Sequence, residues 1–91
     1  MYKTEVEVFA NDSNHAILRH PDREFPGSLF QGDSLSILVA EIGEAIDLLE
    51  SNNTEECKAV LHIIHNSLGS RLQRYETVLR EHEIDLPYAK K

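Results

Sequence analysis

Residues 32–35 read Gly-Asp-Ser-Leu, a setting in which Ser34 could serve as a nucleophile. A serine hydroxyl reacts only when a base takes its proton and donors hold the oxyanion that forms. The Asp-x-x-His spacing that can supply such a base occurs at Asp12–His15, ahead of the serine. No nucleophile has a matched base at a recognisable spacing, so we predict that the protein is not an enzyme and has no catalytic residues.

The same four residues match the nucleophile block of the GDSL esterases and lipases. In those hydrolases, later blocks supply a glycine, an asparagine in a Gly-x-Asn-Asp-type segment and an Asp-x-x-His near the C-terminus. The chain after Ser34 has no Gly-x-Asn-Asp segment, so the resemblance ends after four residues and we reject it. The segment instead indicates a helix start, where Gly32 lets the chain turn and Asp33 or Ser34 accepts hydrogen bonds from free amides.

Two histidines and the single cysteine are the candidates for metal or redox chemistry. His62 and His65 are three residues apart on a predicted helix, a spacing that can present two imidazoles to one metal ion. A third ligand at a suitable spacing is missing, so we predict no metal site and no cofactor. Cys57 falls on the apolar side of the same helix, which favours a buried side chain over a reactive thiol.

Carboxylates gather around the predicted connection between two helices. Glu44, Asp47 and Glu50 follow one side of the first helix, and Glu55 and Glu56 begin the second. An antiparallel arrangement brings these side chains to the tip of a helical hairpin. Because an acidic tip can dock a basic protein by charge complementarity, we predict that these five residues form a binding surface.

The elements that must position these residues are of two kinds, and strands come first. The first twenty residues alternate like strands, with Val6 and Val8 on one face and residues 11–15 as a polar hairpin loop. Residues 21–27 contain two prolines and a glycine, which interrupt regular structure. Residues 28–31 are predicted to form a short third strand.

Two helices follow, because from Leu35 onward apolar residues recur at steps of three and four. The first is predicted over residues 34–51 and the second over 54–82, with Asn53 and Glu56 in a capping-box pattern. The short link between them requires an antiparallel hairpin. We therefore predict an α+β fold, in which an N-terminal β-hairpin, extended by a third short strand in one alternative, packs on a C-terminal antiparallel two-helix hairpin.

The second predicted helix is longer than the first, and its overhang is apolar. The side chains of Leu72, Tyr75 and Leu79 lie on this overhang. Such a patch is normally covered, and twofold pairing is the commonest solution for a second copy. We predict a homodimer with these residues at its interface, unless the strands cover the whole overhang.

Length and composition limit the class of protein. The 91 residues, 41% hydrophobic and 27% charged, are predicted to form a single domain, 1–91, with strands and loop in 1–32, the helical hairpin in 33–84 and a tail in 85–91. The net charge of −7 argues against nucleic acid as a partner. The single cysteine suits a reducing cytoplasm, and the longest apolar run, residues 37–40, is too short for a membrane span.

Three segments resemble a family of small bacterial proteins of unknown function. Residues 23–27 and 31–35 read Arg-Glu-Phe-Pro-Gly and Gln-Gly-Asp-Ser-Leu, and residues 84–88 read Ile-Asp-Leu-Pro-Tyr. The resemblance implies a bacterial origin and no catalytic activity. With the acidic tip and the apolar overhang, it leads us to predict a cytoplasmic, non-enzymatic protein-interaction module of an immunity-like or regulatory kind. The alternative is a small-ligand or metal-binding domain that uses the loop at 21–34 or the pair His62 and His65.

Overall fold

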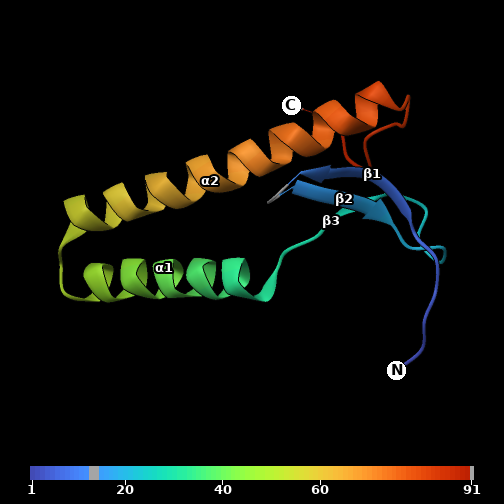
Figure 1. Ribbon diagram of the computed structural model, residues 1–91. Helices are drawn as coiled ribbons and strands as arrows, with labels where there is room; N and C mark the ends of the chain where they lie inside the picture. Colours follow the sequence, from blue (N-terminus) through green and yellow to red (C-terminus); the bar gives the residue numbers. More distant parts are fainter. Residues whose placement is uncertain (13–14, 91) are drawn as a thin grey trace. The chain divides into compact units, whose positions relative to one another are not determined.

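The computed structural model describes residues 1–12 and 15–90, and the chain divides into two compact units (Figure 1). Unit 1 comprises Met1–Phe30 and Leu72–Lys91, and unit 2 comprises Gln31–Arg71. The boundary at residues 71 and 72 falls inside the second helix, whereas the segments predicted from the sequence follow the order of the chain. The prediction of a single domain stays a prediction.

Unit 1 contains a three-stranded antiparallel sheet with the order β1 (Glu7–Asp12), β2 (His15–Arg19) and β3 (Gly27–Ser28). Two helices follow in the chain, α1 (Gly32–Glu50) and α2 (Thr54–Glu81) (Figure 1). This order confirms the predicted α+β class, the third strand and the helical hairpin. In the part of the chain that the structure describes, neither helix has an apolar stretch long enough to cross a lipid bilayer.

The hairpin of β1 and β2 is tighter than predicted, because Asp12 and His15 already pair as strand residues. Residues 11, 12 and 15 of the predicted loop over residues 11–15 therefore belong to strands, and residues 13 and 14 lie outside the described part. The third strand also lies earlier than the predicted range of 28–31. The third strand pairs with β2, with Ile17 opposite Ser28.

A bulge in β1 changes the face that this strand buries. The register passes from Val8 opposite Leu18 to Ala10 opposite Ile17, so Phe9 is the extra residue. A bulge bends a strand and re-aims the side chains beyond it. Phe9 and Ala10 consequently pack against the core, while Val8 stays exposed. Val6 and Val8, which were predicted to share one face of a strand, are both exposed, and Val6 precedes β1.

The core of unit 1 forms between the sheet and the last part of α2. Ile17 of β2 is buried together with three α2 side chains, Tyr75, Val78 and Leu79. The Tyr75 hydroxyl donates a 2.6 Å hydrogen bond to the Pro26 carbonyl, which satisfies a buried polar group on each side. The sheet thus packs on α2 as predicted, because Tyr75, Val78 and Leu79 lie on one side of that helix and contact the sheet.

Both helices end in the same backbone motif. After α1, the Asn53 amide donates to the Leu48 carbonyl and Asn52 has a φ of 64°. After α2, the Ile84 amide donates to the Leu79 carbonyl and Glu83 has a φ of 57°. This is the Schellman motif, in which one left-handed residue lets the chain leave the helix. Asn tolerates that conformation, whereas Glu at the same position carries a steric cost.

Candidate functional site

The helical hairpin of unit 2 carries an exposed aliphatic face. We call it the apolar face; its side chains are between 37% and 63% exposed, and they are Leu35, Val39, Ile42, Ile46 and Leu49 of α1 with Leu61 and Leu68 of α2. The α1 members follow one another at steps of four and three. This is the heptad spacing of side chains that pack against another helix.

Apolar residues of α1 recur from Leu35 onward as predicted, and the structure divides them into a covered stripe and the exposed apolar face. The residues of α1 that are covered most are Ala45, which is buried, and the half-buried Ser34, Leu38, Glu41 and Leu48. Ala45 lies against α2, because the Cys57 thiol donates to its carbonyl oxygen over 3.2 Å. Each α1 residue of the apolar face directly follows a covered residue, so at 100° per residue the covered stripe and the apolar face are centred roughly 100° apart on α1. The more aliphatic stripe is the exposed one.

The rotation has the same sense in α2, and this places both exposed stripes on one side of the hairpin. The covered residues of α2 centre on Cys57, Val60 and Ile64, whereas Leu61 and Leu68 lie roughly 60–70° further round the helix. Because the two helices run antiparallel (Figure 1), rotations of the same sense turn both stripes toward the same side of the hairpin. Sequence periodicity located the stripes but could not show that they point away from their shared contact.

Two further exposed isoleucines mark the opposite side of the hairpin. Ile37 is 62% exposed on α1 and Ile63 is 58% exposed on α2. Both are rotated away from the covered stripe in the sense opposite to the apolar face. They are two side chains against the seven of the apolar face, and a few exposed apolar side chains are ordinary on protein surfaces. They therefore supply matched controls for the apolar face.

The five carboxylates predicted as a binding surface lie at the end of the hairpin where the helices connect. All five are exposed, and among the described residues none takes part in an ion pair: Glu44, Asp47, Glu50, Glu55 and Glu56. Glu55 and Glu56 lie in the first turn of α2, where the helix dipole stabilises negative charge. The last turn of α1 carries no basic residue to offset the charge of the other three carboxylates. This acidic end adjoins the apolar face without being part of it.

The residues predicted as a dimer interface separate in the structure. Tyr75 and Leu79 are 7% and 0% exposed because they lie in the core of unit 1 with Ile17 of β2. Leu72 is 48% exposed. The strands thus cover two of the three side chains, and the contact of these residues with a second copy stays a prediction.

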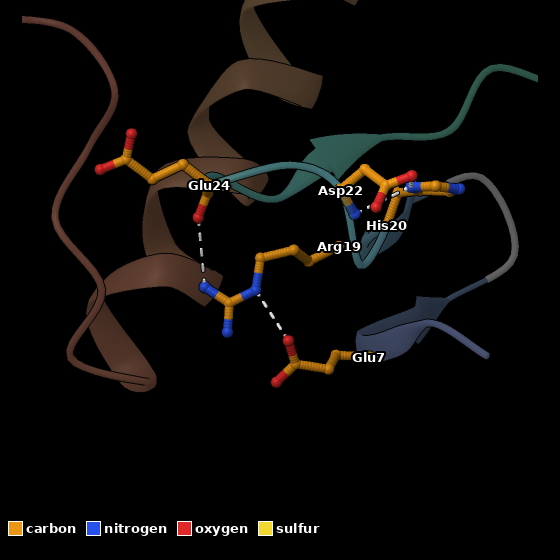
Figure 2. A network of polar contacts seen from close by, with 5 residues as sticks. All are labelled: Glu7, Arg19, His20, Asp22 and Glu24. Atoms are coloured by element: carbon orange, nitrogen blue, oxygen red, sulfur yellow. Dashed lines mark hydrogen bonds and ion pairs between the residues drawn. The ribbon is translucent and has the colours of Figure 1, made fainter. Parts of the chain in front are cut away.

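The loop at residues 21–34 is tied down at its start by Arg19. The Arg19 guanidinium donates to a Glu7 carboxylate oxygen at 2.8 Å and to the Glu24 carbonyl at 3.4 Å (Figure 2). The hydrogen bond to Arg19 lowers the pKa of Glu7, and the same bond raises the pKa of Arg19. The guanidinium also lies 5.4 Å from the centre of the Phe9 ring. Arg19 is consequently engaged as a structural cation.

A shallow hollow of about 450 Å³ lies beside this loop, within unit 1. Its lining is mainly apolar, with one basic side chain, and consists of Leu18, His20, Arg23, Glu24, Phe25 and Gly27. The His20 ring is itself engaged, because Nδ1 accepts a hydrogen bond from the Asp22 amide at 3.1 Å (Figure 2). Arg23 lines the hollow, whereas Arg19 is not among its lining residues.

The histidine pair and the cysteine have separate surroundings. His62 and His65 are exposed and line a shallow hollow with Lys58 and Leu61. Among the described residues, no group of three His, Cys, Asp or Glu side chains is close enough to hold a metal ion. Cys57 is buried against α1, which confirms the predicted buried side chain.

Ser34 lies in the first turn of α1, which begins earlier than predicted. Gln31 occupies the N-cap position and makes no capping side-chain hydrogen bond. Asp33 Oδ1 accepts a 2.8 Å hydrogen bond from the Ser34 amide. The predicted carboxylate at the helix start is therefore present, as the second residue of α1. Gly32 does not have a positive φ, so its predicted role as a left-handed turn is wrong.

A second polar cluster fixes the tail of the chain to α2. Glu76 accepts a 2.9 Å hydrogen bond from the Tyr88 hydroxyl and pairs with Lys90 Nζ at 3.2 Å. These hydrogen bonds lower the pKa of Glu76. Burial, together with the hydrogen bond to Glu76, raises the pKa of Tyr88 to about 12. Through these contacts, Glu76 of α2 anchors Tyr88 and Lys90 of the tail.

Comparison with curated proteins and with solved structures finds no match to this chain. One family does match, described as a family of unknown function (DUF6959), and its sequence model covers residues 1–88. This confirms the resemblance predicted from the sequence, to a family without an assigned activity. The match extends over both units, from the residues before β1 to the tail anchored on Glu76. The chain therefore belongs to the DUF6959 family.

Proposed function

We propose that the protein is a non-enzymatic protein-interaction module, and that the apolar face of the hairpin is its binding surface. The observation that carries this proposal is the exposure of an aliphatic heptad stripe on α1 beside a second stripe on α2. Contiguous aliphatic surface of this kind is uncommon on a monomer unless it contacts another molecule. Helices at heptad spacing favour a helical partner.

The chemistry of the remaining surface is consistent with binding and offers little for catalysis. In unit 2, carboxylates outnumber the two basic residues, Lys58 and Arg71. The acidic end next to the apolar face would favour an orientation in which the partner's own acidic groups lie away from that end. Affinity would come from the aliphatic side chains, because exposed charges contribute more to rate and selectivity than to binding free energy.

The test compares two lysine substitutions on α1. Ile46→Lys places a charge in the apolar face, and Ile37→Lys places one on the opposite side. Each new lysine has a glutamate four residues later, Glu50 or Glu41, so both are compatible with the helix.

Tagged wild-type protein and the two variants would be used to recover proteins from cells that express the chain, with quantitative mass spectrometry. Any protein recovered would then be purified and its binding measured directly. We expect a partner, or the chain itself, that binds the wild type and Ile37→Lys and binds Ile46→Lys at least tenfold more weakly. Equal binding by all three proteins would contradict the proposal.

The second candidate is a ligand site in unit 1, favoured by the hollow beside the loop. Arg23 at its edge suits a small anion with an apolar body. Thermal denaturation with a panel of aromatic and aliphatic carboxylates would test it, since a ligand of the folded state raises the melting temperature. A ligand whose effect disappears in Arg23→Ala would support this candidate. Zinc and nickel belong in the same panel, with His62→Ala as the control, and we expect no stoichiometric binding of either metal.

A further inference from the structure

The apolar face has a property that points to one partner: its α1 stripe is nearly symmetric about Ile42. Leu35 and Leu49 are each seven residues from Ile42, and Val39 and Ile46 are three and four residues from it. An antiparallel pairing of α1 with a second α1 would therefore place leucine against leucine at both ends and isoleucine against isoleucine in the middle. A stripe of this kind is complementary to itself.

The charge distribution favours the same orientation. The five carboxylates of the acidic end lie where the two helices connect. Parallel pairing of two hairpins would bring both acidic ends together, and like charges at close range oppose association. Antiparallel pairing places the acidic ends at opposite ends of the assembly.

The area of the apolar face also matches a dimer. A side chain of the size of leucine carries on the order of 100 Å² of apolar surface on the common transfer scale. Seven side chains at about half exposure thus offer roughly 350 Å² on each copy. A standard interface buries about 800 Å² per partner, of which about 65%, or roughly 500 Å², is apolar in homodimers. The face supplies most of this requirement, and the backbone and small residues between the stripes would add to it.

We propose that the occupant of the apolar face is a second copy of this chain, and that two hairpins join into an antiparallel four-helix bundle with α1 on α1 across a twofold axis at Ile42. This inference rests on the proposed function, because it names the partner of the same surface. Closed twofold pairing uses each face completely and leaves none exposed. Four antiparallel helices with heptad stripes toward a common core form a standard bundle.

The first arm of the test is light scattering over a range of micromolar concentrations. We expect wild-type protein and Ile37→Lys to have twice the 10.4 kDa mass of the chain, and Ile46→Lys to have the monomer mass. A monomeric wild type, or a dimeric Ile46→Lys variant, overturns the proposal. If the wild type is monomeric but a purified partner still distinguishes Ile46→Lys from Ile37→Lys, only the identity of the partner is wrong and the proposed function stands.

The second arm reports on orientation and needs no disrupted interface. In a Cys57→Ser background, which keeps a donor to the Ala45 carbonyl, a single cysteine is introduced at Ile42 or at Leu49. At the twofold axis the two copies of residue 42 are neighbours, whereas the two copies of residue 49 are about 20 Å apart, since seven residues on each side rise 1.5 Å each. We expect rapid oxidation of Ile42→Cys to a disulfide-linked dimer and none for Leu49→Cys. Equal or reversed crosslinking overturns the antiparallel bundle.

Discussion

The hydrogen bond between Tyr75 and Pro26 joins the loop before β3 to α2, and its removal should weaken unit 1 by a predictable amount. Tyr75→Phe deletes only the hydroxyl, so the packing of the ring against Ile17 and Leu79 is retained. The lost bond is 2.6 Å long and buried, and the Pro26 carbonyl would be left without its donor. A buried carbonyl without a partner costs about 1–3 kcal/mol. We expect the free energy of unfolding to fall by about 2 kcal/mol, because the carbonyl regains only partial access to water.

For a domain of this size, that loss corresponds to a decrease of roughly 8–16 °C in melting temperature. The free energy of unfolding would be measured by urea titration at one fixed protein concentration, followed by near-ultraviolet circular dichroism of the tyrosines. Tyr2→Phe is the control, since Tyr2 is 76% exposed. Leu79→Ala provides an upper reference, because truncation of a fully buried leucine costs about 2–5 kcal/mol. A Tyr75→Phe variant as stable as Tyr2→Phe would refute the reasoning that this bond closes the unit.

Three other substitutions test local features of the fold. Glu83→Gly should raise the free energy of unfolding by about 1 kcal/mol in denaturant titrations, because Glu83 has a left-handed backbone that glycine adopts without strain; an unchanged or lower stability would contradict the Schellman reading. Ser34→Ala should change stability by less than about 1 kcal/mol, because only its amide is bonded by Asp33, and should show the same absence of esterase activity as the wild type. The fold raises the pKa of Tyr88 from 10.0 to about 12, so the stability that this phenol contributes is fully present below pH 10 and is lost as the pH rises through 12. The phenolate absorbance that disappears in Tyr88→Phe should accordingly have its midpoint near pH 12, and a midpoint near 10 would show that the hydroxyl is free in solution.

Local signals predicted the helices well, because their causes are local. The second helix was expected over residues 54–82 and runs over Thr54–Glu81, since both its apolar repeat and its flanking residues lie within the same stretch. The sequence did not indicate the motif that ends α2, because its left-handed position is occupied by Glu83 and not by the glycine that usually marks it. Its motif depends instead on the contact of Ile84 with the core of unit 1.

Features that depend on distant parts of the chain were predicted less well. Strict alternation assumed an unbroken strand through Val6 and Val8, but the extra residue at Phe9 shifts the register of β1, so that Phe9 and Ala10 contact the core while Val8 stays exposed. Periodicity likewise located the apolar residues of α1 but did not show which of them α2 covers. A pattern of apolar residues shows that a face needs a partner, but it cannot say which segment, or which molecule, provides one.

The two units differ in how completely they satisfy that need. In unit 1 the sheet and α2 enclose Ile17, Val78 and Leu79 almost fully, so its apolar residues find their partners within the chain. In unit 2 the buried side chains are Ala45, Cys57 and Ile64, and the larger aliphatic residues of α1 remain outside this small core. Burial of apolar surface is the main favourable term in both folding and association. The unit whose folding leaves most of that surface exposed is therefore the one from which binding can gain most, and it is the hairpin, not the loop with the Gly-Asp-Ser-Leu segment, that bears the candidate function of this protein.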